Sequence, residues 1–201
     1  MADQLNKEII HLNKLITDIG LKVKSAVSDS MDAIRLMDKD KAMLINKKDA
    51  VIDQLEVELE EACLNILALH QPVAMDLRYI FAITKINSDL ERVGDLASNI
   101  AQMVHKFKDN SKIVIPKRIF SMSSIVQNML EISLDSLINK KTNVAKTVLI
   151  MDDEVDSIHN SMYRFIELKS KEDYKMMGQW LCVLSVSRYL ERIADHATNI
   201  S

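Results

Sequence analysis

Acidic residues spaced four apart are the feature of this sequence best suited to chemistry. The pairs are Asp49 with Asp53, Glu91 with Asp95, Asp152 with Asp156, and Glu191 with Asp195. On a helix, residues four apart share a face, and like charges at that spacing cost about 0.2–0.5 kcal/mol of helix stability. The repeated pairs therefore call for a compensating cation. Two pairs on neighbouring helices would form an all-oxygen cage, which suits Mg²⁺, Ca²⁺, Mn²⁺ or iron, and carboxylates can bridge several ions.

Asparagines extend two of these pairs by one further helical turn. Asn99 follows Asp95, and Asn199 follows Asp195, so each could add an amide oxygen to a metal site. Two structural interpretations compete with this one. The acidic stripes can be solvated helix faces, neutralised by Arg92 and Arg192, and the asparagines can cap or cross-link helices. The residue types and their spacing leave metal binding and these structural roles open.

Histidines and cysteines add little to the predicted chemistry. His196 follows Asp195 and His159 lies three residues after Asp156, so either could supply a nitrogen ligand, although lone histidines are more often bystanders. Cys63 and Cys182 lie far apart without CxxC spacing, and we interpret them as reduced core residues. The sequence has no nucleophile elbow and no readable Ser/His/Asp or Cys/His arrangement. A ferritin-like di-iron enzyme needs Glu-x-x-His on two helices, and the acidic pairs offer only Asp156-x-x-His159 in its place, so redox catalysis is a weak rival.

The composition indicates an all-α protein. Of 201 residues 48% are hydrophobic, which argues against disorder, while 3 Gly and 2 Pro are too few for the turns of a β-sandwich or for glycine-rich phosphate loops. The formal net charge is −3 and no basic block occurs, so no nucleic-acid partner is expected. No signal peptide and no apolar run of about 18 residues is found, so we expect a cytoplasmic protein that meets the membrane only through partners.

Apolar residues repeat at alternating steps of three and four along most of the chain, as in the helix that begins Leu5, Ile9, Leu12. Breaks occur around Pro72, in the polar stretch after Lys108, at 139–143, and at 170–173, where Ser170 or Asp173 is a candidate N-cap. Pro72 is expected near the first turn of the third helix. The pattern predicts six helices, at about 3–37, 40–70, 72–107, 116–138, 142–168 and 173–201.

The six helices form two sets of three that repeat in sequence. LERVGDLASNI at 90–100 aligns with LERIADHATNI at 190–200, with seven of eleven positions identical. The aspartate pair at 49 and 53 aligns with the pair at 152 and 156, an offset of 103 instead of 100. We therefore predict a tandem duplication with near-antiparallel packing: a first three-helix repeat at 1–108, a linker at 109–115, and a second repeat at 116–201 with a short last helix.

The duplicated segment resembles the signature of the PhoU family, phosphate-signalling proteins that accompany the bacterial phosphate ABC transporter. HQPVAMDLRYI at 70–80 is similar to the family's segment that opens the third helix. The second repeat departs from this pattern, because it has KEDYKMMGQW at the corresponding place. The resemblance covers essentially the whole chain.

The resemblance implies a six-helix bundle and metal ions held by the (E/D)xxxD carboxylates, in some members as multinuclear iron or zinc clusters. One site would then use Asp49, Asp53, Glu91, Asp95 and Asn99, and the other Asp152, Asp156, Glu191, Asp195 and Asn199. The family implies a homodimer that negatively regulates the phosphate regulon, acting between the transporter's ATPase subunit and a sensor histidine kinase. We expect a regulatory adaptor without catalytic turnover. The alternatives are a metal-dependent phosphatase, with clustered metals activating water, and a plain helical scaffold.

Overall fold

The computed structural model describes residues 2–108, 113–139 and 144–201, and these residues are helical apart from short connections. The elements are α1 (Ala2–Leu36), α2 (Lys39–His70), α3 (Ala74–Lys106), α4 (Lys117–Asn139), α5 (Ala145–Glu172), the 3₁₀ helix η1 (Tyr174–Met176) and α6 (Met177–Ile200). The all-α prediction is confirmed, and every helix end lies within four residues of its predicted position. None of the described helices has an apolar stretch of the length needed to cross a membrane.

The connections explain most of the small differences at the helix ends. Pro72 precedes α3 instead of lying in its first turn, because Gln71 ends α2 in the left-handed conformation and α3 begins at Ala74. Asp173 caps η1, its carboxylate accepting a hydrogen bond from the Lys175 amide at 2.9 Å, whereas Ser170 lies inside α5. The predicted linker at 109–115 and turn at 139–143 fall mostly on 109–112 and 140–143, which lie outside the described residues.

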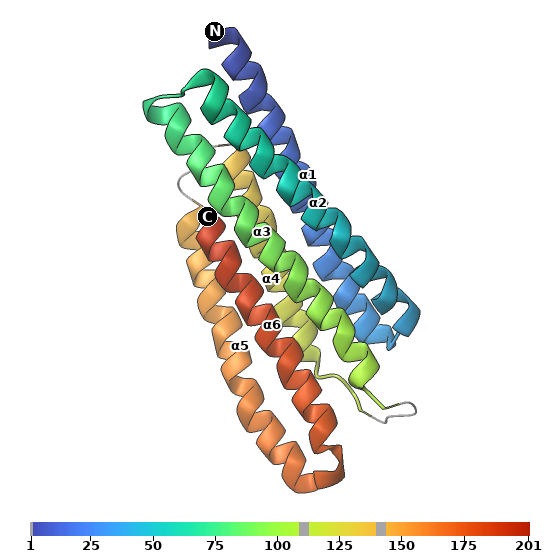
Figure 1. Ribbon diagram of the computed structural model, residues 1–201. Coiled ribbons are helices and arrows are strands. Elements are labelled where there is room, and N and C mark those ends of the chain that lie inside the picture. The colour runs from blue at the N-terminus through green and yellow to red at the C-terminus, as the bar shows by residue number, and fades with distance from the viewer. Residues whose placement is uncertain (1, 109–112, 140–143) are drawn as a thin grey trace.

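The two halves of the chain form two three-helix units that lie side by side. α1, α2 and α3 pack on one another, as do α4, α5 and α6, and the units meet through α3 against α6 and α1 against α4. In Figure 1, α2, α3, α6 and α5 follow one another in a layer with α1 and α4 behind it. The helices that carry the acidic pairs, α2 with α3 and α5 with α6, are therefore the two outer pairs of that layer.

The apolar seams predicted from sequence form a continuous core. Leu12, Ile16, Ile19 and Val23 of α1 are at most 1% exposed, and Leu90 and Leu190 are fully buried at equivalent places in α3 and α6. The apolar spacing also predicts that Leu69 and Met75 are buried, and this prediction is wrong: both flank the α2–α3 turn and are 77% and 73% exposed. Cys63 is buried as expected, whereas Cys182 is half-buried and donates to the Gly178 carbonyl.

Two glycines allow close approach between helices. A Cβ on Gly20 of α1 would lie 2.7 Å from Leu134 Cδ1 of α4, where the two units meet. A Cβ on Gly94 of α3 would lie 3.3 Å from Ile52 Cδ1 and 3.5 Å from Asp49 Oδ1 of α2. Gly94 therefore brings the backbone of α3 close to the helix that carries the first aspartate pair.

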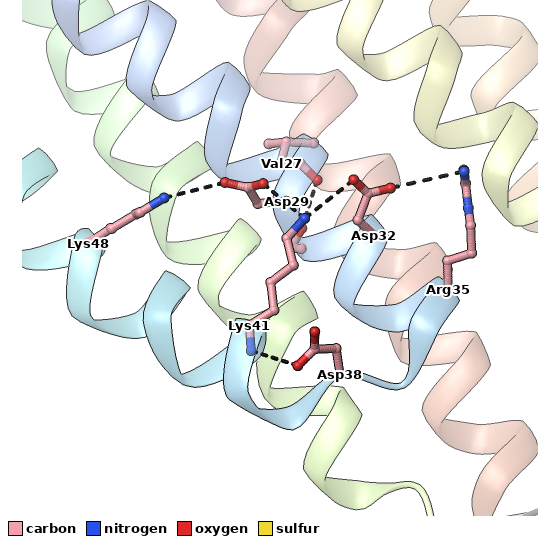
Figure 2. A network of polar contacts seen from close by, with 8 residues as sticks. Val27, Asp29, Asp32, Arg35, Asp38, Lys41 and Lys48 are labelled. Atoms are coloured by element: carbon pink, nitrogen blue, oxygen red, sulfur yellow. Dashed lines mark hydrogen bonds and ion pairs between the residues drawn. The ribbon is translucent and has the colours of Figure 1, made fainter.

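A network of charges fixes the turn between α1 and α2 (Figure 2). Asp38 caps α2 by accepting from the Lys41 amide at 2.9 Å, and the Lys41 ammonium lies 3.1 Å from Asp29 and 3.4 Å from Asp32 of α1. Burial opposes the charged form of Lys41, but the two aspartates outweigh it and raise the pKa of Lys41. The network ties the start of α2 to the end of α1 and so helps fix the height at which Asp49 and Asp53 stand beside α3.

Candidate metal centre

The structure brings the first two acidic pairs together across the contact between α2 and α3. Asp49 of α2 lies near Asp53 on its own helix and near Asp95 of α3, close enough for both charges to bear on its pKa. Glu91 of α3 is likewise influenced by Asp95 and by Asp53 and Glu56 of α2. We call Asp49, Asp53, Glu56, Glu91 and Asp95 the first carboxylate cluster.

Burial and mutual repulsion raise the pKa values of Asp49, Glu56 and Glu91 in the first cluster, and the Arg92 charge offsets the shift at Glu91 only in part. Burial raises the pKa of Asp49, and Asp53 and Asp95 raise it further, although the Ser98 hydroxyl bonds to the carboxylate and works against the shift. Burial followed by the charges of Glu60 and Asp53 raises the pKa of Glu56. A cation bound among these side chains would reverse the shifts, because an opposite charge at close range favours the ionised carboxylate.

The remaining acidic pairs form an equivalent group on α5 and α6. Burial raises the pKa of Asp152, and the charges of Asp156 and Asp195 raise it further. The pKa values of Glu191 and Asp195 are raised by burial and then by neighbouring carboxylates, Asp156 among them. We call Asp152, Asp156, Glu191 and Asp195 the second carboxylate cluster. All eight acidic residues predicted from the repeated spacing thus fall into two groups, each spanning a helix pair.

Unpartnered oxygens provide an independent test of whether a cation fits these groups. The Oδ1 atom of Asp152 is buried and has no hydrogen-bond partner, and the same is true of the amide oxygens of Asn46 and Asn87, which lie along the first cluster. A buried oxygen without a donor costs free energy, and a hard cation would satisfy it. Within the described ranges, no three His, Cys, Asp or Glu side chains already stand at ligating distance, so binding requires carboxylate side chains to turn inward. The donor chemistry fits a metal ion.

Two predicted ligands face elsewhere. His196 of α6 places its Nδ1 atom 2.8 Å from Asp89 of α3, across the contact between the two repeats. The Asn199 amide donates to the same Asp89 oxygen at 3.4 Å. These contacts direct His196 and Asn199 towards the first repeat, away from α5, and give them a role in joining the repeats. Asn99, the equivalent of Asn199, is half-buried on α3 one turn beyond Asp95.

His159 of α5 is part of the second cluster's surroundings. Only 8% of the residue is exposed, its Nδ1 atom lies 2.8 Å from the Ser187 hydroxyl of α6, and its ring meets Tyr163 edge to face. Burial lowers the pKa of His159, with the Asp156 carboxylate acting in the opposite direction. The imidazole is therefore held between α5 and α6, one turn along α5 from Asp156.

The sequence analysis missed Glu56, Asn46 and Asn87. A helical signal for Glu56 is present, because it follows Asp53 by three residues and Asp49 by seven, which places all three on one face. Its equivalent in the second repeat is His159, so Glu56 is not part of the duplicated acidic pattern. The two asparagines carry no distinctive spacing, and only the structure shows that their oxygens are buried and unpartnered.

Comparisons with known proteins agree with the duplicated architecture. A family model described as the PhoU domain matches residues 16–104 and again residues 119–201. A protein of Clostridium acetobutylicum named "Phosphate-specific transport system accessory protein PhoU homolog" is 34% identical, over 96% of this chain and 89% of its own length. A homologue of the same name from Aquifex aeolicus is 35% identical over 94% of this chain and 86% of its own.

Solved structures extend the likeness to three dimensions. The crystal structure of PhoU from Pseudomonas aeruginosa superposes with a TM-score of 0.92 at 31% identity, covering 97% of this chain and 94% of that one. The phosphate transport system regulatory protein PhoU from Streptococcus pneumoniae gives a TM-score of 0.90 at 28% identity, with coverages of 98% and 92%. The fold is thus shared along essentially the whole of each chain.

Proposed function

The chain belongs to the PhoU family, and we propose that it is a metal-binding regulatory adaptor of phosphate uptake. In this proposal it works in the cytoplasm, as a homodimer, beside a phosphate ABC transporter. It contacts the transporter's ATPase subunit and a sensor histidine kinase, restrains uptake and keeps the phosphate regulon silent when phosphate is plentiful. Its support comes from relatives named as accessory and regulatory proteins of phosphate transport systems.

The observation that carries the metal-binding part is the pair of carboxylate clusters at equivalent places in the two repeats. Each cluster spans the outer helix pair of its unit, and each contains carboxylates whose pKa values are raised by burial and by their neighbours. Bound cations would neutralise this charge and hold α2 to α3 and α5 to α6. The ligands proposed are Asp49, Asp53, Glu56, Glu91 and Asp95 in the first cluster and Asp152, Asp156, Glu191 and Asp195 in the second.

We propose that the protein acts through contact and not through catalytic turnover. The rival function, metal-dependent phosphoryl hydrolysis, needs a general base or a metal-bound water placed against a substrate. Of the two imidazoles near the second cluster, His159 is 8% exposed and bonded to Ser187, and His196 is bonded to Asp89. These contacts suit both rings to holding a position more than to shuttling protons to a substrate. Testing for phosphatase activity with each metal separates the two functions, and metal-dependent turnover would contradict the adaptor proposal.

The adaptor proposal is tested by binding to the purified ATPase subunit of a phosphate transporter. We expect the metal-loaded chain to bind the subunit, and the double variant Asp95→Asn with Asp195→Asn to bind it more weakly. The matched control is Glu58→Gln with Glu154→Gln. These exposed glutamates of α2 and α5 stand two residues from Glu56 and from Asp156, and residues two apart on a helix do not share a face. The control should bind like the wild type, and failure of the wild-type chain to bind would contradict the proposal.

A further inference from the structure

A polar hollow lies on the contact between α3 and α6, where the two repeats meet. Its volume is about 490 Å³, and its polar lining includes Lys85, Ser88, Asp89 and Arg92 of α3 and His196 and Asn199 of α6. The α3 residues are three or four apart and so share one helix face, as do the two α6 residues. The hollow is therefore separate from the carboxylate clusters, which lie where α3 meets α2 and where α6 meets α5.

The equivalent place on the other side of the α3–α6 contact has different side chains. At the offset of 100, Asp89 corresponds to Tyr189 and His196 to Leu96. Tyr189 packs against the hydrophobic core and Leu96 is 3% exposed, so apolar groups serve this contact well. On the side of the hollow, polar and charged groups take their place, which gives up the stabilisation that apolar burial supplies. This loss points to a function for the polar hollow.

The hollow holds two cations against one carboxylate, although the chain as a whole has a formal net charge of −3. Lys85 and Arg92 are both exposed, and within the described parts of the chain neither forms an ion pair. The Lys85 ammonium lies 5.5 Å from the centre of the Phe81 ring on its own helix. An ammonium offers a point charge and a guanidinium offers a planar fork of donors, and both bind the oxygens of phosphate-type anions. The lining therefore suits an oxyanion.

The hydrogen bonds of Asp89 indicate which oxyanion the hollow suits. The His196 Nδ1 atom, at 2.8 Å, and the Asn199 amide nitrogen, at 3.4 Å, both contact its Oδ1 atom. The described residues make no hydrogen bond to its Oδ2 atom, so this oxygen can accept one. An ionised carboxylate only accepts hydrogen bonds, so it favours an anion that carries a proton. Near neutral pH orthophosphate keeps a proton, whereas sulfate has none and most phosphomonoester molecules have lost theirs.

We propose that the hollow between α3 and α6 is a binding site for free orthophosphate. Lys85 and Arg92 bind the phosphate oxygens, the exposed Ser88 hydroxyl donates to one of them, and Asp89 accepts the hydrogen bond of the phosphate O–H group. The bound ion lies between the two repeats, so the phosphate concentration can influence how firmly α3 and α6 are held together. The inference goes beyond the proposed function, because it gives the chain its own means of sensing phosphate and needs neither a metal ion nor a protein partner.

The site is tested by calorimetric titration of chelator-treated protein with orthophosphate, at constant ionic strength and near neutral pH. We expect saturable binding, about 10-fold or more tighter than that of sulfate or AMP, which lack the proton that Asp89 accepts. Lys85→Gln and Arg92→Gln should each weaken phosphate binding by about 10-fold or more, the size of one hydrogen bond to a charged group. The matched control is Arg188→Gln, which removes the same charge from an exposed position of α6 outside the hollow and should change the affinity by less than about 2-fold.

Asp89→Asn tests the selectivity of the site. The amide can donate to either anion and carries no charge, so the phosphate and sulfate affinities of this variant should come within about 2-fold of each other. A purely structural role of Asp89 would leave the preference of the folded protein for phosphate as it was, and that result would overturn the assigned role.

Four other results would overturn the proposal. They are no saturable phosphate binding by the metal-free wild type, sulfate or AMP binding as tightly as phosphate, an equal loss of affinity in Arg188→Gln, and phosphate binding that occurs only after metal ions are restored. The last result would assign the anion to the carboxylate clusters. Because the titration contains neither a metal ion nor a transporter subunit, failure of this inference leaves the proposed function standing, and failure of the proposed function leaves the inference standing.

Discussion

The first carboxylate cluster is flanked by Asn46, Glu60 and Asn87, whereas the second is flanked by Leu149, His159 and Tyr163. Both clusters lie between an outer helix and the inner helix on which it packs. The pKa values of Asp49 and Glu91 are raised in the first cluster, and those of Asp152 and Asp195 in the second. The difference shows that the same pair of packed helices can keep its facing carboxylates while the side chains one turn away differ in chemistry. The packing of the helices and the side chains beside each cluster can therefore be altered by separate substitutions.

The contact between the repeats is asymmetric in the same way. Asp89 of α3 meets His196 and Asn199 of α6, whereas the equivalent positions in the other direction hold Tyr189 and Leu96. Among the described residues, the Asp89 contact therefore has no counterpart at Tyr189 and Leu96 on the equivalent side of the α3–α6 interface. This one-sided contact distinguishes the α3 side of the interface from the α6 side, which the apolar seams of the two repeats do not.

The largest predicted effect tests whether the two cores are equivalent. Leu90 and Leu190 are both fully buried at matched positions, so Leu90→Ala and Leu190→Ala should each lower the free energy of unfolding by about 2–5 kcal/mol. Urea denaturation measures both losses. A loss below about 1 kcal/mol for either variant would show that the repeats do not share one packing scheme.

The next effect tests how closely the two helices of each cluster pack, α2 against α3 and α5 against α6. Ala194 is fully buried where α3 has Gly94, and Ala194→Gly should destabilise the protein by about 1 kcal/mol through helix propensity alone. Gly94→Ala should change stability by less than about 1 kcal/mol, because the helix-propensity gain is opposed by a Cβ only 3.3 Å from Ile52 Cδ1. Thermal unfolding of the two variants compares them, and a gain of about 1 kcal/mol in Gly94→Ala would mean that the two helix pairs are equally spaced.

His196→Leu gives the second repeat the residue that the first has at the equivalent position, Leu96, and so tests what the polar contact between α3 and α6 contributes to stability. It removes the 2.8 Å contact with Asp89 and leaves that half-buried carboxylate with Asn199, so we expect a loss of about 0.5–1.5 kcal/mol. Chemical denaturation near neutral pH measures it. Thr198→Ala, whose hydroxyl donates to the Asp195 carbonyl of its own helix, is the local control. An unchanged midpoint in His196→Leu would show that the Asp89 contact does not stabilise the interface.

The smallest effect is the pH dependence of the metal-free protein. Carboxylates whose folded pKa is raised bind more protons in the folded state, so their contribution to stability is present below the unfolded pKa of about 4 and is lost as pH rises through the raised values. Asp49→Asn and Asp152→Asn should therefore each stabilise the chelator-treated protein near neutral pH, by about 0.2–0.5 kcal/mol from relief of like-charge repulsion. Unfolding curves at pH 5 and pH 7.5 measure the trend, and a variant that lost stability at the higher pH would contradict the assigned repulsion.

The sequence predicted the helices and the facing carboxylates because both follow from local periodicity. Leu12, Ile16 and Ile19 lie on one stripe whatever their partners are, and the duplication distinguished Asp49 and Asp152 from ordinary surface acids. Partner-dependent features were not predictable. The direction of His196 depends on Asp89 in another repeat, and the unpartnered oxygen of Asn87 depends on the nearness of α2. Leu69 and Met75 fit the apolar spacing but flank the α2–α3 turn and are exposed.

Metal content is the most direct test of the claim that the two clusters are metal sites. Untagged protein purified without chelator is analysed by elemental mass spectrometry, beside Asp95→Asn with Asp195→Asn and beside the control Glu58→Gln with Glu154→Gln. We expect bound iron, zinc or manganese in the wild type and in the control, and a marked fall in the aspartate variant. The absence of metal from the wild type, even after reconstitution, or an unchanged content in the aspartate variant, would contradict the claim and leave the carboxylates as surface charge.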